Sequence, residues 1–338
     1  MKTIIVHHRS PHHAKHSGYG RLIDYLENAY EVRGSSWLPY RLAKLIGTWS
    51  HQQAGLYDSS SVFKELELYK NLRQCTEPTI VHYLNAERDV RHLVKHHNKR
   101  QVKFVGTFHK PPHILKQTIA DTRYLKHLNG AICVGDNQVD FIKSWLGLEH
   151  VMYIPHGVDT QFFLPDISKR REEPHLLFVG QHLRDFETLN ACVPEIIARM
   201  PQTKVTVILK KEFVEKVLPH ENIRICHGLH DEALRTEYQK AHILLLPLLE
   251  ATACNSILEA MACGLPVITS RVGGLKSCLD GTGNIFCDNK KEFIDRTIAL
   301  LGDNYQQHKI AEACRLKALT YDWHVIVEQV KQFYNTIL

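Results

Sequence analysis

The sequence predicts an α/β protein with two domains, each built around a parallel sheet. Strand-like apolar runs and helix-like amphipathic segments alternate through nearly the whole chain, which is typical of βαβ units. The 338 residues are enough for two domains that each bury their own core. Apolar residues make up 44% of the chain and charged residues 23%, which is an ordinary globular balance.

The first half of the chain supplies the elements of the first domain. The expected strands are 3–8, 79–84, 102–108, 131–135 and 151–154. The expected helices begin near residue 21 and then span 60–73, 87–99 and 137–147. The segment 87–99 is basic, and we expect it to present a solvated face.

The second half repeats the alternation. The expected strands are 175–180, 204–209, 223–228 and 243–249, with another beginning at 267. The expected helices are 232–241, 254–263, 290–301, 306–320 and 321–338. A domain junction is expected near 157–172, and the polar run over 166–174 supports it.

Residues 242–271 contain the main candidates for ligand binding. Helical spacing places Asn255 and Glu259 on one face of the predicted helix, opposite a core face formed by Ile257, Leu258 and Met261. The amino end of that helix suits a phosphate, and Glu250 and Glu259 can accept hydrogen bonds from hydroxyl groups. A phosphate beside polyol-binding carboxylates describes a sugar nucleotide. The alternative is a solvated helix face with an ordinary glutamate at a strand end.

The segment E-A-T-A-C-N-S-I-L-E-A-M-A-C-G-L-P-V-I resembles the donor site of retaining glycosyltransferases of the GT-B fold, group 1 (family 4). It departs from the usual pattern because eight residues, not seven, separate Glu250 from Glu259. P-H-G-V-D-T-Q-F-F-L-P resembles the family's boundary segment, with His156 where asparagine is usual. The resemblance implies two Rossmann-like domains facing a cleft, 1–160 and 170–320, with a helix at 321–338 that crosses back to the first.

The resemblance also implies roles for residues of the second domain. Glu250 would bind sugar hydroxyls, Glu259 the ribose, and Arg184 the donor diphosphate. The lysine that usually follows the arginine is missing, and Lys210 or Lys211 could replace it. The remaining donor-binding candidates are His227, Gly228, Thr252, Ala253, Cys254, Asn255 and Ser256, and Gly273-Gly274 matches a loop that approaches the sugar. The plainer alternatives are a helix-start salt bridge for Arg184 and solvated strand ends for the lysines.

Two further candidates lie in the first domain. The turn after the first strand contains Gly18 and Gly20, which allow close approach to a ligand but do not form a dinucleotide fingerprint. His109 follows a parallel strand, where ligands bind in open α/β sheets, and could contact the sugar or a phosphate. The alternative for His109 is a hydrogen-bonded core histidine.

The expected activity is transfer of a hexose from a nucleotide-diphosphate sugar, such as a GDP- or UDP-hexose, to a glycan, a glycolipid or another hydroxyl acceptor. Retention of configuration follows from the resemblance alone. The sequence lacks a D-x-D motif, and cationic groups can perform a metal's role, so no essential divalent ion or other cofactor is expected. Two alternatives are a degenerate nucleotide-sugar-binding protein and a sugar-nucleotide epimerase of the same fold.

Composition bounds the compartment and the partners. Nine cysteines without a C-x-x-C pair indicate reduced thiols and a cytoplasmic protein. A net charge of +6 fits nucleotide diphosphates or an anionic membrane surface, whereas no dense basic stripe suggests nucleic acid.

The amphipathic segment 36–51 could contact a membrane or a lipid-linked acceptor, or pack against its own domain. No apolar run is long enough to span a membrane, and the start of the chain reads as a strand rather than a signal peptide. The paired histidines 7–8, 12–13 and 96–97 fit a solvated surface better than a zinc site.

Overall fold

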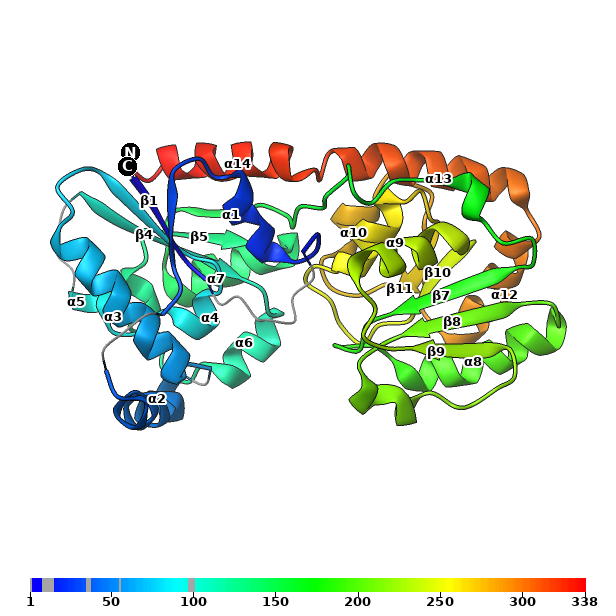
Figure 1. Cartoon of the computed structure of the whole chain (residues 1–338), viewed down its shortest axis with the longest axis horizontal. Helices are drawn as coiled ribbons and strands as arrows, with labels where there is room; N and C mark the ends of the chain where they lie inside the picture. The colour runs from blue at the N-terminus through cyan, green and yellow to red at the C-terminus, as the bar shows by residue number, and fades with distance from the viewer. Residues whose placement is uncertain (1, 8–14, 35–37, 55, 97–100) are drawn as a thin grey trace. The chain divides into compact units, whose positions relative to one another are not determined.

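The computed structural model describes residues 2–7, 15–34, 38–54, 56–96 and 101–338, so Trp37 and most of the paired histidines lie outside the described residues. The chain forms two compact units (Figure 1). Unit 1 contains Met1–His13, Tyr19–His156 and Trp323–Leu338, and unit 2 contains Ala14–Gly18 and Gly157–Asp322. The chain therefore passes from one unit to the other inside the P-H-G-V-D segment.

Unit 1 is built on a six-stranded parallel sheet with the order β2-β1-β3-β4-β5-β6. Its strands are β1 (Lys2–Val6), β2 (Ala29–Val32), β3 (Thr79–Tyr83), β4 (Val102–Phe108), β5 (Gly130–Cys133) and β6 (Val151–Tyr153). The central strand β3 is buried along its whole length, as expected for a sheet covered on both faces. The edge strand β2 has no counterpart among the predicted elements, because four residues with alternating exposure give almost no periodic signal.

The helices of unit 1 are mostly short. They are η1 (Tyr19–Arg21), α1 (Leu22–Tyr25), α2 (Tyr40–Ala54), α3 (Ser59–Arg73), α4 (Ala86–Asp89), α5 (Leu93–His96), α6 (Pro112–Thr118), η2 (Leu125–His127), η3 (Asp136–Gln138), α7 (Val139–Leu146) and α14 (Trp323–Asn335). The C-terminal segment packs against β5 within unit 1. A Cβ atom on Gly130 would lie 2.5 Å from Cδ1 of Ile337, so the bare glycine permits this close contact.

The prediction of a solvated basic helix over 87–99 is wrong. The segment breaks into α4 and α5, and Glu87 and Asp89 are buried. The break has an identifiable cause, because Oε1 of Glu65 on α3 accepts hydrogen bonds from the backbone N–H groups of residues 91, 92 and 93. These N–H groups lie at the start of α5, where a helix needs external acceptors.

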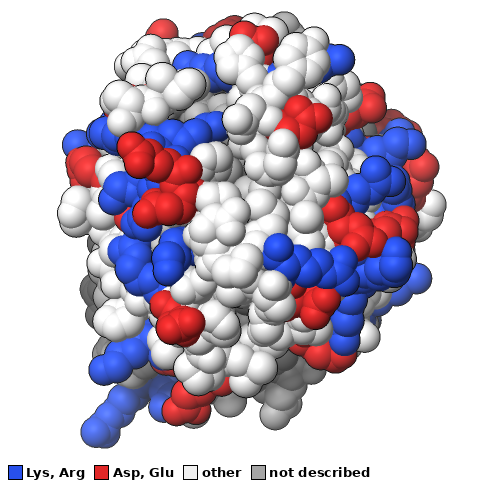
Figure 2. Space-filling view, turned by 90° about the vertical axis from the view of Figure 1, so that its right-hand side faces the viewer, with Lys and Arg blue, Asp and Glu red and all other residues white. Residues whose placement is uncertain are grey.

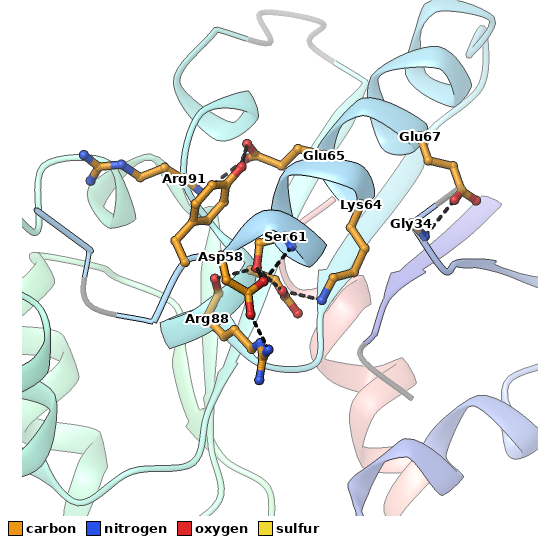
Figure 3. A network of polar contacts seen from close by, with 10 residues as sticks. Gly34, Asp58, Ser61, Lys64, Glu65, Glu67, Arg88 and Arg91 are labelled. Atoms are coloured by element: carbon orange, nitrogen blue, oxygen red, sulfur yellow. Dashed lines mark hydrogen bonds and ion pairs between the residues drawn. The ribbon is translucent and has the colours of Figure 1, made fainter. Parts of the chain in front are cut away.

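The α3 helix is the centre of a buried polar network in unit 1 (Figure 3). Lys64 pairs with Asp89, and both side chains are almost completely buried, at 1% and 0% exposure. The hydroxyl of Ser61 donates to the same carboxylate oxygen at 2.8 Å. Further along the helix, Glu67 accepts a hydrogen bond from the backbone N–H of Gly34 at 2.8 Å.

Unit 2 contains a second six-stranded parallel sheet with the order β12-β11-β10-β7-β8-β9. Its strands are β7 (His175–Val179), β8 (Lys204–Ile208), β9 (Ile223–Cys226), β10 (Ile243–Leu246), β11 (Val267–Ser270) and β12 (Ile285–Cys287). Its helices are η4 (Ile167–Lys169), α8 (Phe186–Arg199), η5 (Lys211–Lys216), α9 (Asp231–Lys240), α10 (Asn255–Ala262), α11 (Leu275–Leu279), α12 (Lys290–Leu301) and α13 (Asn304–Leu319). The strand order reverses beside β7, so a ligand is expected at the carboxyl ends of β7 and β10.

Two observations concern the protein's surroundings. Within the described residues, no helix combines the length and hydrophobicity that crossing a bilayer requires. The face drawn in Figure 2 carries acidic and basic side chains in mixed order on either side of an uncharged band. The excess positive charge is therefore not gathered into one basic patch on that face.

Candidate functional site

The site in unit 2 begins with the loop between β10 and α10. The prediction of a core face on this helix is confirmed, since Ile257 and Met261 are fully buried and Leu258 is 3% exposed. Cys254 occupies the N-cap position with extended backbone, and its side chain makes no cap hydrogen bond among the described residues. The amino end of α10 therefore keeps its capacity to bind an anion.

Arg184 lies beside this helix end. Its Nη2 donates to Oγ of Ser256 at 2.9 Å and lies 3.6 Å from Sγ of Cys254. Its Nε donates to the carbonyl of Val179 at 2.9 Å, so the last residue of β7 fixes the guanidinium. The structure thus brings Arg184, Cys254 and Ser256 together, as a phosphate clamp requires. It shows no salt bridge for Arg184 within the described part of the chain.

The turn that carries Arg184 has an unusual backbone. Leu183 has a φ of +54°, a left-handed conformation that costs a residue with a Cβ atom about 1–2 kcal/mol. Gly180 has a φ of +92°, and a Cβ atom there would lie 2.9 Å from Nη2 of Arg184. Gly180 therefore leaves room for the guanidinium, and a strained backbone such as that of Leu183 is often found at functional sites.

Thr252 adds a second polar group to the loop. Its side chain is 4% exposed, and its hydroxyl has no hydrogen-bond partner among the described residues. A buried hydroxyl without a partner costs about 1–3 kcal/mol, so it favours a ligand that supplies an acceptor or a donor. Ala253, the next residue, is half-buried in the same loop.

Glu259 lies one turn further along α10 and is 5% exposed. Its Oε2 accepts a hydrogen bond from the hydroxyl of Tyr238 at 2.8 Å, and its Oε1 accepts one from the hydroxyl of Ser17. Burial raises the pKa of this carboxyl group to about 7, although both hydrogen bonds and the charge of Arg184 oppose the shift. Both carboxylate oxygens of Glu259 thus accept hydrogen bonds from hydroxyl groups of this chain, and its expected contact with a ribose stays a prediction.

Glu250 lies at the opposite side of the same loop, against the Gly273-Gly274 turn. Gly273 has a φ of +55°, and a Cβ atom there would approach the carbonyl oxygen of Ala251 to 1.6 Å and Oε1 of Glu250 to 2.6 Å. Gly274 donates its backbone N–H to the same carbonyl at 3.1 Å. Only glycine fits at 273, and the turn fixes the backbone next to Glu250.

Other candidates are not drawn into these contacts. Lys210 and Lys211 are exposed beyond the end of β8 and form no salt bridge within the described residues. His227 and Gly228 are exposed beyond the end of β9, and Gly228 has a φ of +65°. Asn255 begins α10 and is half-buried. Whether these residues contact a donor stays a prediction.

His109 follows β4 in unit 1 and is engaged inside that unit. Its Nε2 donates to the carbonyl of Leu84 at 2.6 Å, and its Nδ1 lies 3.1 Å from Nε2 of His156. Burial lowers its pKa to about 4. Binding a sugar would require His109 to give up one of these bonds, so its proposed role stays a prediction.

The two loop glycines divide between the units. Gly18 has a φ of +90°, and no described atom lies within 4 Å of the point where a Cβ atom would stand, so this glycine serves the turn. A Cβ atom on Gly20 would lie 2.4 Å from Nε2 of His7, so this glycine is required by a contact within unit 1. The spacing of the two glycines in the sequence does not show that Gly18 serves the turn and Gly20 makes room for His7.

Ser17 and Tyr238 were missed as site residues. Ser17 lies in the predicted Gly-rich turn, and Tyr238 follows Leu234 by one helical turn on α9. Helical spacing marks Tyr238 as a buried position, but no local signal identifies Glu259 as the partner of either hydroxyl.

The arrangement in unit 2 suits a diphosphate bound to polyols. The helix end, Arg184 and the Thr252 hydroxyl can bind phosphate oxygens, and Glu259 and Glu250 can accept hydrogen bonds from hydroxyl groups.

The two parallel-sheet units and this site define a protein of the GT-B architecture. Residues 173–303, which lie in unit 2, match the family model described as "Glycosyl transferases group 1", so the resemblance predicted from the motifs is confirmed over that part of the chain. The fold is also that of sucrose-phosphate synthase from Thermosynechococcus elongatus, with a TM-score of 0.73, 15% identity, and coverage of 99% of this chain and 98% of that one. The predicted fold class is thereby confirmed.

Two curated proteins are similar to part of this chain. A human phosphatidylinositol N-acetylglucosaminyltransferase polypeptide is 26% identical over 186 residues, which are 52% of this chain and 37% of the relative. The gpi3 component of the same-named transferase from Schizosaccharomyces pombe is 24% identical over 241 residues, which are 66% of this chain and 51% of the relative. The aligned chain thus spans about half the length of these relatives or less.

Proposed function

We propose that this protein is a glycosyltransferase that moves a hexose from a nucleotide-diphosphate sugar to a hydroxyl acceptor, with retention of anomeric configuration and without an essential metal ion. The observation that carries the proposal is the cluster of Arg184, Ser256 and the open amino end of α10 next to the buried Glu259. The group 1 domain matched over 173–303 supports it. Retention is proposed from the family resemblance.

In the proposed reaction, the bond between the anomeric carbon and the diphosphate oxygen breaks, and its electron pair stays on the leaving diphosphate. The acceptor hydroxyl transfers its proton to the leaving diphosphate, and the acceptor oxygen bonds to the anomeric carbon. Positive charge develops on the sugar ring and negative charge on the leaving phosphate. Arg184 and the N–H groups at the start of α10 stabilise the phosphate charge, which is the role a divalent ion fills in other enzymes. Glu259 holds the ribose and Glu250 the sugar hydroxyls.

A donor panel tests this assignment. UDP-, GDP-, ADP- and TDP-sugars are added to the full chain in the presence of a chelator, and the melting temperature is recorded. We expect one nucleotide family to raise it, because a ligand bound only to the folded state stabilises that state by about 2.7 kcal/mol at 100 times its Kd. No shift with any donor in a folded sample would overturn the proposed donor site.

The Glu259→Gln variant should fold normally and lose most of the donor-induced rise in melting temperature. The reason is that the amide has an NH2 donor in place of one of the two acceptor oxygens of the carboxylate. In the wild type, affinity should fall as the pH drops below the Glu259 pKa of about 7, since the protonated carboxyl accepts hydrogen bonds less well. In the glutamine variant this step should disappear. The exposed Glu195, paired with Arg199 at 2.8 Å, offers the matched control Glu195→Gln.

We further propose that the acceptor is borne by a membrane and that α2 touches that membrane. The names of both relatives above include phosphatidylinositol, a membrane lipid. The support in this chain is the orientation of α2. Its small residues Ala43, Gly47 and Ser50 are buried, and its exposed large apolar residues recur at helical spacing: Leu42 (48%), Leu45 (66%), Ile46 (39%) and Trp49 (62%).

The small inner face explains why the apolar stripe points outward. A Cβ atom on Gly47 would lie 2.8 Å from the backbone of Asp58, so the helix lies close against α3 on its small side. Arg41 and Lys44 are exposed beside the stripe. An exposed apolar stripe flanked by basic residues is the pattern of a helix lying on an anionic bilayer.

Vesicle sedimentation tests the membrane contact. The chain should bind phosphatidylcholine vesicles that contain phosphatidylinositol, and Leu45→Glu should weaken binding roughly tenfold or more, because a buried leucine contributes about 1.5–3 kcal/mol. Arg41→Gln should weaken binding only to the anionic vesicles, by about fivefold. The control is Leu218→Glu on unit 2, where the leucine is 55% exposed. Equal binding of Leu45→Glu and wild type would contradict the contact.

A further inference from the structure

Unit 2 contains a cavity of about 720 Å³ that is separate from the candidate donor site. Its walls come from the segment around η4, the end of α9, the end of α10 and the length of α13. This volume is within the range of about 300–1,000 Å³ typical of small-molecule sites. None of the residues assigned to donor binding lines it.

Two arginines line the cavity, and neither forms a salt bridge with a described residue. Arg170 lines the cavity, and its Nε is buried with no hydrogen-bond partner among the described residues. Burial lowers the pKa of this guanidinium, which means that its charge is poorly solvated. A buried charged donor is normally paired, so this Nε favours a ligand that supplies an anionic acceptor.

A second arginine strengthens the case. Among the described residues, the Arg315 guanidinium donates to the backbone carbonyls of Phe163, Ala262 and Thr160, at 2.8–3.1 Å. It forms no salt bridge within the described part of the chain. The charge of Asp322 interacts with that of Arg315 without a direct contact. The Asp322 carboxylate accepts a hydrogen bond from the Thr160 hydroxyl. The three carbonyl groups thus hold the guanidinium beside the cavity, and within the described part of the chain no carboxylate contacts it.

The acidic residues of the wall are already engaged. Asp166 lies 3.4 Å from Nζ of Lys169 and accepts a hydrogen bond from the Ser168 hydroxyl at 2.6 Å. Glu312 lies 3.7 Å from Nδ1 of His308. Because each acid has a local basic or hydroxyl partner, neither neutralises Arg170 or Arg315 by contact.

His242 supplies a neutral donor. Its Nδ1 accepts the backbone N–H of His175 at 3.2 Å, and burial lowers its pKa to about 4, so the ring is neutral at pH 7 with its proton on Nε2. The remaining wall is apolar in part. Pro165, Ile167 and Leu316 line it, and the last two are 76% and 67% exposed.

We propose that this cavity binds a small amphiphilic anion, with its phosphate or carboxylate on Arg170 and Arg315 and its apolar body against Ile167 and Leu316. The cavity and the candidate donor site lie at opposite ends of α10. Cys263 and Gly264, at the end of this helix, form part of the cavity wall, whereas Asn255 and Ser256 begin the helix at the donor site. The proposal does not depend on glycosyltransferase activity, since it concerns binding alone.

Calorimetry with decyl phosphate below its micelle concentration tests the site. Decanol supplies the chain without the charge, and inorganic phosphate supplies the charge without the chain, so the three probes separate the contributions. We expect decyl phosphate to bind at least about tenfold more tightly than either control, because charge-assisted hydrogen bonds and apolar burial both contribute. Binding of inorganic phosphate as tight as that of decyl phosphate would overturn the amphiphilic assignment.

The Arg170→Gln variant should weaken decyl phosphate roughly tenfold or more, since a hydrogen bond from a charged donor is lost. The adjacent Arg171 does not line the cavity, and Arg171→Gln is the matched control with the same change in charge. Leu316→Glu provides a second test that spares the fold, because this side chain is largely exposed, and it should abolish binding by placing a negative charge at the mouth. Wild-type affinity in both Arg170→Gln and Leu316→Glu would overturn the proposal.

Discussion

Replacing Arg184 with alanine is expected to lower the turnover of the bound nucleotide sugar roughly 100-fold or more, which corresponds to about 2.7 kcal/mol of lost leaving-group stabilisation. The guanidinium is held by the Val179 carbonyl and the Ser256 hydroxyl, both at 2.9 Å, so it is positioned before any ligand binds. A preorganised charge stabilises the transition state without a cost of reorganisation. Donor hydrolysis measures the effect even before the acceptor is known.

The control for Arg184 is an arginine of the same unit in an ordinary surface pair. Arg199 is 50% exposed and pairs with Glu195 and Asp295, so Arg199→Ala should leave turnover unchanged. Thermal melting of each variant checks that the fold survives. Unchanged turnover in Arg184→Ala would move the phosphate role to Lys210 or Lys211.

Replacing Lys64 with methionine is expected to lower the free energy of unfolding of unit 1 by about 3–5 kcal/mol, the usual cost of leaving one charge of a buried pair without its partner. Asp89 is fully buried, and its Oδ2 has no hydrogen-bond partner among the described residues. Without Lys64, only the Ser61 hydroxyl at 2.8 Å would remain on Oδ1 (Figure 3). The carboxylate would have to take up a proton or admit water.

Tryptophan fluorescence in urea can follow this unfolding selectively, because all four tryptophans of the chain lie in the segments of unit 1. The double variant Lys64→Met/Asp89→Asn should recover at least half of the loss, since it removes both charges and keeps an acceptor for Ser61. The exposed pair Lys331–Glu328, at 2.8 Å, is the comparison, and Lys331→Met should cost about 1 kcal/mol or less. An equally small cost for Lys64→Met would contradict a structural role for the buried pair.

The segment 87–99 shows where sequence reasoning about the fold fails. Its basic composition predicts a solvated helix, yet Glu87 and Asp89 turn inward and the helix breaks before Leu93. The cause is the Glu65 carboxylate, which lies 28 residues before Leu93 and accepts its N–H. A pattern within one element contains no information about a partner on another element.

The donor site shows the same division. The spacing of α10 correctly predicts its buried face, and the motif correctly places Glu259 on that helix. It does not identify Ser17, which lies 242 residues away and donates its hydroxyl to Glu259. The sequence also leaves open the orientation of α2. The large apolar residues of this helix are exposed because Gly47 and Ala43 let its side with small residues lie against α3.

The sequence by itself determined the parallel α/β architecture and the strand–loop–helix unit around 242–271, because both follow from periodicity and from turn residues that act over a few positions. Only the tertiary structure decided which ionisable groups are buried and which remain without partners. It buries Glu259 beside Tyr238 and holds Arg184 on Ser256. Within the part of the chain that the structure describes, it leaves Nε of Arg170 without a hydrogen-bond partner. Burial and pairing depend on segments that are distant in the chain, so they appear only when the sheets and helices have packed.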